Sequence, residues 1–283
     1  MGVLELPGPV VDVAWLAANL GHDRLVVVDA GVGEHRHPAT RVPGAVVFDL
    51  DGSLSDGASV LPHTMPGPEH FAAQVQRLGI GDGSTVVAYD GAGLFSSARA
   101  WWMLRAMGFD RAAVLDGGMP AWVADGRATE PTGGDAPAPV AGAAFTPRPR
   151  PGLFVDRGAV QAALVRPGSA VLDARSRARY TGAVDEPRPG LRRGHVPGAG
   201  NLPFDTVQQD GRLRDAAQLR ELFAGAAPGS GALVLSCGSG VTACVLALAA
   251  DVAGFEHISV YDGSWTEWGA REDLPVALGD EGR

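Results

Sequence analysis

The chain has 283 residues, a formal net charge of -9, and no lysine among its 23 basic residues. This length allows two domains with separate cores, and the acidic charge argues against nucleic acid or an anionic membrane as a partner. The lack of lysine excludes Schiff-base chemistry and a P-loop lysine.

Targeting and redox signals are equally sparse. No apolar run reaches membrane-spanning length, and the N-terminus lacks a signal-peptide pattern, so we expect a cytoplasmic protein with no membrane partner. Only two cysteines occur, Cys237 and Cys244, so no disulfide framework is expected.

Short Val-rich strands alternate with helical stretches in the first half. Leu25–Ala30 and Ser84–Tyr89 have the pattern of buried strands, and 69–78 and 96–107 have the pattern of helices. This alternation predicts right-handed βαβ units around a parallel sheet, an α/β fold with helices on both faces.

A segment rich in Pro, Gly and Ala follows, from Glu130 to Pro151. It has little periodicity, which is typical of a linker that runs extended over a surface. We therefore predict a first domain over 1–128, a linker over 129–151 and a second domain over 152–283.

The second half repeats the landmarks of the first in the same order. Leu25–Ala30 matches Ala170–Ala174, Val42–Ala45 matches Val196–Ala199, and Val114–Trp122 matches Val260–Trp268. The repeat predicts an ancient duplication. In this alignment Asp90 of the first half stands where Cys237 stands in the second, and we interpret Asp90 as structural, in the manner of a helix cap.

The segment 236–244 lies between a strand-like run and a helix-like run over 241–250. A strand, a Gly-rich loop and a helix together form an anion nest, with Cys237 facing its backbone N–H groups. A cysteine there is expected to be a thiolate nucleophile near neutral pH. The alternative, a small core cysteine, suits Cys244 better, because packing alone does not require Gly-Ser-Gly after Cys237.

About ten extra residues follow Asp173 in the second half, and many of them are arginines. Arginine binds carboxylates through two parallel hydrogen bonds, so such an insertion suits a small anionic substrate. For most of these arginines, Arg192 and Arg193 included, a solvated loop is the expected alternative.

The loop Cys237-Gly-Ser-Gly-Val-Thr-Ala, together with His63-Thr-Met-Pro-Gly-Pro, Ala100-Trp-Trp-Met-Leu-Arg and Leu115-Asp-Gly-Gly, carries a family resemblance. The chain resembles two-domain sulfurtransferases of the rhodanese superfamily over nearly its whole length. The resemblance implies two tandem rhodanese-like domains, the first silent at its cysteine position. The neutral Gly238 and Ser239 resemble the loop of mercaptopyruvate-using members, whereas thiosulfate-preferring members carry two basic residues there.

The resemblance also implies roles for individual residues. It makes Cys237 the nucleophile and joins Ser239 to His63 and Asp51 in a Ser-His-Asp relay. It assigns substrate binding to two arginines and to backbone groups of the loop, which are Arg179, Arg188, Gly238, Gly240, Val241 and Thr242.

The implied reaction moves sulfur from 3-mercaptopyruvate, a small anionic donor, to a thiol, a thioredoxin-like protein or cyanide through a Cys237 persulfide. No metal or other cofactor is expected, because the His and Cys residues lack metal-ligand spacing. Two alternatives stay open at this point: a thiosulfate:cyanide sulfurtransferase, and a binding module without catalysis.

Overall fold

The computed structural model describes residues 4–132 and 143–280. The chain forms two compact units, each described here by itself. The first comprises residues up to 58, 65–150 and 210–213, and the second comprises 59–64, 151–209 and 214 onward. Part of the predicted linker, 133–142, lies outside the described residues.

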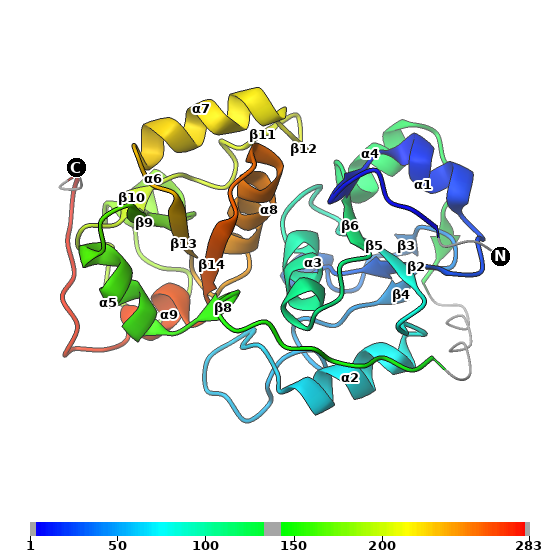
Figure 1. Ribbon diagram of the computed structural model, residues 1–283, viewed down its shortest axis with the longest axis horizontal. Coiled ribbons are helices and arrows are strands. Elements are labelled where there is room, and N and C mark those ends of the chain that lie inside the picture. Colours follow the sequence, from blue (N-terminus) through cyan, green and yellow to red (C-terminus); the bar gives the residue numbers. More distant parts are fainter. Residues whose placement is uncertain (1–3, 133–142, 281–283) are drawn as a thin grey trace. The chain divides into compact units, whose positions relative to one another are not determined.

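The first unit is built on a five-stranded parallel sheet (Figure 1). Its strands, in spatial order, are β1 (Val10–Val11), β6 (Ala112–Leu115), β5 (Thr85–Tyr89), β2 (Leu25–Asp29) and β4 (Val46–Val47). The central strand β5 is buried along its whole length. Such continuous apolar runs suit a parallel sheet covered on both faces.

Helices cover both faces of this sheet. They are α1 (Val13–Asn19), α2 (Pro68–Arg77), α3 (Ser97–Ala106) and α4 (Gly118–Ala124), with a 3-10 turn at Gly33–His35. Leu16 of α1 and Trp122 of α4 pack in one core cluster with β2, β5 and β6. Asp12 caps α1 by accepting the N–H of Trp15. The predicted helices over 69–78 and 96–107 are confirmed to within a residue or two.

The second unit repeats this architecture. Its parallel strands, in spatial order, are β8 (Phe154–Val155), β14 (His257–Tyr261), β13 (Ala232–Ser236), β9 (Ser169–Asp173) and β10 (Gly200–Asn201). In both sheets the strands have the same spatial order relative to their order along the chain. The sheets therefore confirm the duplicated α/β fold that the repeat predicts.

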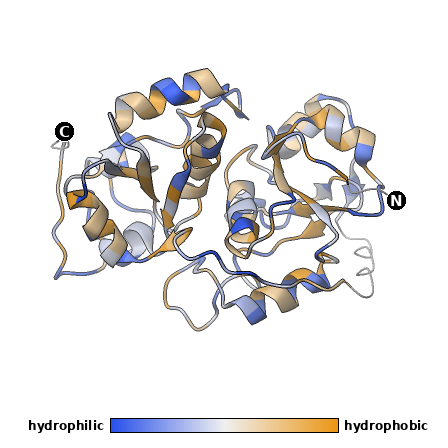
Figure 2. Cartoon of the chain, in the orientation of Figure 1, coloured by the Kyte–Doolittle hydropathy of each residue, from blue (hydrophilic) through white to orange (hydrophobic). Residues whose placement is uncertain are grey.

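The helices of the second unit are α5 (Arg157–Val165), α6 (Arg177–Tyr180), α7 (Ala216–Ala226), α8 (Ala243–Ala253) and α9 (Ser264–Trp268). Helix α8 is apolar on nearly all sides and is almost wholly buried, and Figure 2 shows much of it and of the sheet strands in orange. It begins two residues later than predicted, because Gly240 has a φ of 75° and the loop continues beyond it. It ends at Gly254, which adopts the left-handed conformation common after helices.

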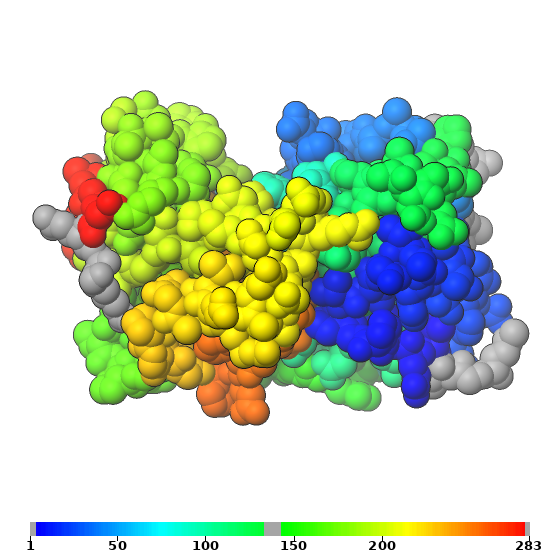
Figure 3. Space-filling view, turned by 90° about the horizontal axis from the view of Figure 1, so that it is seen from above, coloured from blue at the N-terminus to red at the C-terminus, as the bar shows by residue number. Residues whose placement is uncertain are grey.

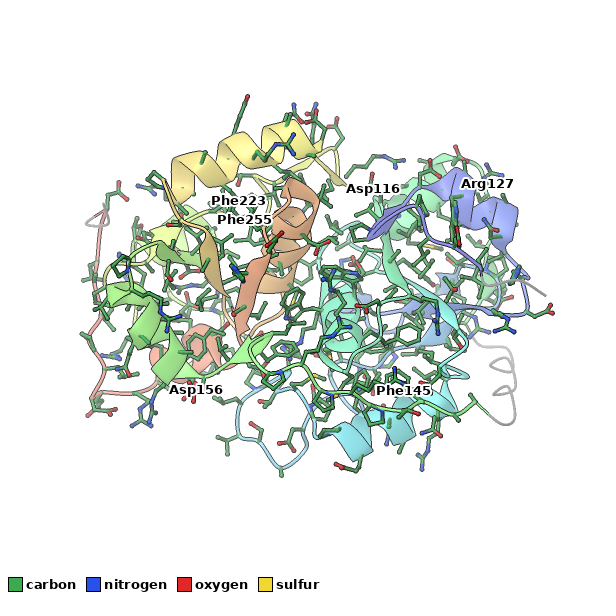
Figure 4. The ribbon with its side chains drawn as sticks, in the orientation of Figure 1. Asp116, Arg127, Phe145, Asp156, Phe223 and Phe255 are labelled. Atoms are coloured by element: carbon green, nitrogen blue, oxygen red, sulfur yellow. The ribbon has the colours of Figure 1, made fainter. Side chains whose placement is uncertain are left out.

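Helix α7 is amphipathic, and its solvent side is visible in yellow in Figure 3. Its buried side carries Leu219 and Phe223, and the ring centroids of Phe223 and Phe255 are 5.2 Å apart. Figure 4 labels both residues. This contact links α7 to the segment that follows α8.

The predicted linker is more structured than its composition indicates. Within it, β7 (Glu130–Pro131) pairs antiparallel with β3 (Thr40–Arg41), and Phe145 is buried against Phe71 and Phe109 of the first unit. Two further short strands are β11 (Gln208–Gln209) and β12 (Arg212–Leu213). No helix in the described part of the chain is long and apolar enough to cross a membrane.

Candidate active site

Cys237 directly follows β13, at the carboxyl end of the central strand of the second sheet. In open α/β sheets this edge is where ligands bind. Cys237 is 2% exposed, and the glycine-rich loop after it leads into α8. Both Cys237 and Cys244 are free thiols, and the Sγ of Cys244 contacts the carbonyl of Gly240 inside the helix start. Cys237 thus stands at the sheet edge where this fold class binds ligands, whereas Cys244 lies inside a buried helix.

The matching loop of the first unit shows what such a loop binds. Asp90 follows β5 and is fully buried. Its carboxylate accepts hydrogen bonds of 2.7–3.0 Å from the backbone N–H groups of Ala92, Phe95, Ser96 and Ser97 and from the Ser97 hydroxyl. The first loop is therefore an anion nest filled by a side chain of the chain itself.

Ser239 and His63 lie together, as the predicted relay requires. The Oγ of Ser239 is 3.0 Å from the Nδ1 of His63, and Ser239 is 7% exposed. His63 comes from the segment 59–64, which belongs to the second unit although it precedes most of that unit by about a hundred residues. The contact gives the Ser239 hydroxyl a titratable partner two residues from Cys237.

Asp51 belongs to the first unit. Its Oδ2 accepts the N–H of Gly33 at 2.9 Å. Its predicted part in the relay stays a prediction.

Arg179, on α6, lies over the loop that carries Cys237. A Cβ atom built on Gly238 would be 3.0 Å from the Nη2 of Arg179. The guanidinium is held by Glu186, with Nε 3.1 Å from Oε1 and Nη2 2.5 Å from Oε2. Its side chain keeps 25% of its surface exposed, so it can still meet a ligand.

A buried charge network supports Glu186. Arg175, with none of its side chain exposed, binds Glu186 at 2.8 Å and Asp173 at 2.5 Å, and its guanidinium lies 4.4 Å from the centre of a Trp265 ring. Burial lowers the pKa of Arg175, but the charges and hydrogen bonds of Asp173 and Glu186 outweigh it and raise that pKa. Arg175 thus holds Glu186 in place, and Glu186 in turn holds Arg179 beside the loop.

The remaining arginines of the insertion differ in environment. Arg188 is exposed, and its predicted role in substrate binding stays a prediction. Arg193 is exposed as expected and pairs with Asp185. Arg192 is instead a structural residue, because its nitrogens bind the carbonyls of Trp268, Gly269, Arg271 and Leu274. The expectation of a solvated side chain is wrong for Arg175.

His195, in the turn shared by the two halves, is a core residue. Its ring stacks on Tyr180 with 3.7 Å between centroids, and its Nδ1 is 2.8 Å from the carbonyl oxygen of Tyr180. Burial lowers the pKa of His195, so the neutral ring is favoured. Within residues 4–132 and 143–280, no group of three or more His, Cys, Asp or Glu is placed to hold a metal ion.

A model of the rhodanese-like domain matches the chain twice, over residues 12–125 and 157–271. The chain belongs to the rhodanese family. Its relatives include the 3-mercaptopyruvate sulfurtransferase of Escherichia coli K12, which is 39% identical over 93% of this chain and 95% of that protein. The human 3-mercaptopyruvate sulfurtransferase is 37% identical over 98% of this chain and 90% of its own length. An Arabidopsis thaliana relative, 38% identical over 95% of this chain and 78% of that protein, is a mitochondrial thiosulfate/3-mercaptopyruvate sulfurtransferase.

Solved structures of the family have the same fold. SseA from Escherichia coli, a 3-mercaptopyruvate sulfurtransferase, superimposes with a TM-score of 0.79 at 33% identity, covering 91% of this chain and 99% of that one. The sulfur transferase subunit of yeast mitochondrial complex I gives 0.84 at 30% identity, covering 97% and 100%. The chain is accordingly a sulfurtransferase with two rhodanese domains.

Sequence reasoning missed two groups of residues at this site. Glu186 and Arg175 lie in the arginine-rich insertion, where the sequence singles out only Arg179 and Arg188. Ser264 and Thr266 contact the backbone of Cys237 and Gly238, and in the sequence they stand out only as part of the repeat. A signal for Ser264 was present, since the aligned position in the first half is Gly118.

Proposed function

We propose that this chain takes sulfur from 3-mercaptopyruvate onto Cys237 and passes it to a thiol, a thioredoxin-like dithiol or cyanide. The observation that carries the proposal is the 3.0 Å contact between Ser239 Oγ and His63 Nδ1, beside the nucleophile. It supplies a proton path in a loop that has no basic side chain of its own.

The donor decides whether such a path is needed. The Cys237 thiolate attacks the donor sulfur, the carbon–sulfur bond breaks, and its electron pair leaves on carbon as the enolate of pyruvate. That carbon must then gain a proton, which Ser239 relays with His63, whereas the donor's S–H hydrogen stays on the outer sulfur of the persulfide. Thiosulfate would leave as sulfite, with no carbon to protonate. A Ser-His pair is therefore better explained by mercaptopyruvate. The resemblance adds Asp51 to this relay.

Two features would hold the charges of the reaction. Arg179, placed over Gly238, and the exposed Arg188 are proposed to bind the donor carboxylate and ketone. Backbone N–H groups from Gly238 through Gly240 and Val241 to Thr242 are proposed to hold the sulfur anion. The filled nest of the first unit supports this role, because five donors there converge on the Asp90 carboxylate.

The second half-reaction restores the enzyme. An acceptor thiolate attacks the outer sulfur of the Cys237 persulfide, the sulfur–sulfur bond breaks, and Cys237 leaves as a thiolate. With cyanide the same step gives thiocyanate, and a dithiol acceptor can close to a disulfide and release sulfide. A reducing cytoplasm, part of this proposal, suits the two free thiols.

A thiosulfate sulfurtransferase is the second candidate function. The Arabidopsis relative named for both donors favours it. The neutral Gly238 and Ser239 count against it, since a dianion would gain from basic residues near the attacked sulfur. A binding module without catalysis would not explain why Cys237, the Ser239–His63 pair and Arg179 lie together at one loop.

A donor comparison tests the proposal. Wild type, Cys237→Ser and the matched control Cys244→Ser are assayed with 3-mercaptopyruvate and with thiosulfate, and the first product is weighed by mass spectrometry. We expect kcat/KM to favour mercaptopyruvate, to vanish in Cys237→Ser and to persist in Cys244→Ser, with one sulfur atom added to the Cys237 peptide. A preference for thiosulfate would overturn the donor assignment, and no transfer from either donor would overturn the function.

The relay is tested on the same two donors. His63→Gln is expected to lower kcat with mercaptopyruvate by about tenfold to a hundredfold, the usual worth of a proton-transfer group, and to leave thiosulfate turnover within about twofold. His70→Gln, an exposed histidine on α2, is the control. An equal loss with both donors would contradict the relay.

A further inference from the structure

Ser264 has an unusual backbone conformation. It is the first residue of α9, shortly after β14, and has a φ of 49°, in the left-handed region that L side chains rarely adopt. It is fully buried. A glycine would take this conformation without strain. A strained non-glycine residue beside a site calls for an explanation in terms of that site.

The side chain of Ser264 bonds to the nucleophile's own backbone. Its Oγ donates to the carbonyl of Tyr261 at 2.8 Å, which leaves the oxygen as an acceptor. At 3.1 Å it accepts the N–H of Cys237. Ser264 thereby fixes Cys237 to the turn that starts α9.

The next two residues hold the loop by its carbonyls. The N–H of Trp265 bonds to the carbonyl of Cys237 at 2.9 Å, and Thr266 bonds to that of Gly238 through its N–H at 2.9 Å and its Oγ1 at 2.6 Å. In a trans peptide the carbonyl and the following N–H point in opposite directions. With both carbonyls turned to α9, the N–H groups of Gly238 and Ser239 point away from it.

The first unit provides an internal comparison. At the position aligned with Ser264, Gly118 has a φ of 52°, and Met119 bonds to the carbonyl of Asp90 at 3.0 Å as Trp265 does to that of Cys237. A Cβ on Gly118 would lie 2.4 Å from the Gly93 carbonyl oxygen and 2.5 Å from that of Asp90. The same turn thus occurs in both units, but a side chain is present only in the unit that carries a cysteine.

We propose that Ser264 is a positioning residue for Cys237. By holding the Cys237 N–H, and with Thr266 and Trp265 holding the carbonyls, it keeps the amides of Gly238 and Ser239 directed at the sulfur in both its thiolate and persulfide forms. The inference rests on the proposed function for its place in the reaction, but its test does not depend on sulfur transfer.

Ser264→Ala and Ser264→Gly are compared with wild type, with Ser169→Ala, another buried serine of the second unit, as control. The rate of Cys237 alkylation by iodoacetamide is followed from pH 5 to 10 by peptide mass mapping, alongside thermal unfolding. We expect both Ser264 variants to move the midpoint of the profile to higher pH and to lower kcat/KM about tenfold or more, because the loop loses its buried hydrogen bond.

Ser264→Gly separates positioning from stability. Glycine relieves the left-handed strain, so this variant should unfold at a temperature no lower than that of Ser264→Ala while still losing reactivity. Wild-type alkylation profiles and kcat/KM in both variants would overturn the proposal. If wild type transferred no sulfur from either donor, the proposed function would fail, while the alkylation profiles would still decide the role of Ser264.

Discussion

The loops after the two central strands have the same frame and opposite contents. Each begins with a residue at the sheet edge, and each follows it with a glycine covered by a side chain: His35 lies 2.9 Å from the Cβ position on Gly91, and Arg179 lies 3.0 Å from that on Gly238. In the first loop the backbone N–H groups bind the carboxylate of Asp90. In the second, the same position holds Cys237, and we propose that its sulfur takes the place of that carboxylate. The comparison teaches that one loop frame can hold different residues at the sheet edge, a bound carboxylate in one unit and a cysteine in the other.

The largest effect is expected from making the second loop like the first. Cys237→Asp places a carboxylate that the loop amides can bind, so the protein should fold while sulfur transfer is abolished with every donor. Activity assays and thermal unfolding check this. An unfolded variant would mean that the two loops do not share a common nest.

The reverse change removes the anion from the first loop. Asp90→Asn removes the negative charge and replaces one acceptor oxygen by an NH2 group, which would face the N–H of Ala92 if the other oxygen keeps its partners. It should lower the free energy of unfolding by ~1–3 kcal/mol, the range for a buried hydrogen-bonding group left without its partner. Urea denaturation measures it, with the exposed Asp23→Asn as control. A change below about 0.5 kcal/mol would show that the nest does not need its anion.

The role of Arg179 is tested by changing Glu186, which holds its guanidinium. Glu186→Gln weakens the hold on Arg179 and should raise the KM for 3-mercaptopyruvate about tenfold, with a smaller fall in kcat. The neighbouring Asp185→Asn breaks only the exposed pair with Arg193 and should leave both constants near wild type. Equal effects of the two substitutions would remove Glu186 from the site.

A smaller difference between the two units is expected in how their stability depends on acidic pH. The turn before Val-Pro-Gly holds Arg41, paired with Glu130 at 2.7 Å, in the first unit and the buried neutral His195 in the second. The pKa of Glu130 is lowered by its hydrogen bond with Arg41, so that stabilisation is lost only as pH falls through the acidic range of carboxylates. The pKa of His195 is lowered by burial, so its contribution is present above the unfolded value of about 6.5 and is lost as pH falls below it.

The second unit should therefore weaken at a higher pH than the first. Unfolding of wild type and His195→Asn at pH 7.5 and pH 5.5 checks this, and the variant should lose less stability between the two. An identical acid dependence in both proteins would contradict the assignment of His195 as a buried neutral ring.

Much of the fold and part of the site can be predicted from the sequence, and there is a physical reason why the remaining features cannot. The repeat predicts the duplicated sheets because apolar strands and Val-Pro-Gly turns are local signals. The pairing of His63 with Ser239 follows only from the family resemblance, since the two are 176 positions apart. Glu186 and Arg175 escape because a charged residue in a polar insertion has the same local pattern whether solvated or buried. Ser264 escapes because a backbone angle leaves no trace in composition.

Arg179 above Gly238 limits how donor preference can change. Thiosulfate-preferring members of the superfamily carry a basic residue directly after the cysteine. In this chain a Cβ atom at position 238 would lie 3.0 Å from the Nη2 of Arg179. A lone Gly238→Arg change would require a small shift of the Arg179 guanidinium and would bring a second positive charge to this loop. A change of donor preference in this chain is therefore expected to involve the position of Arg179 as well as residue 238.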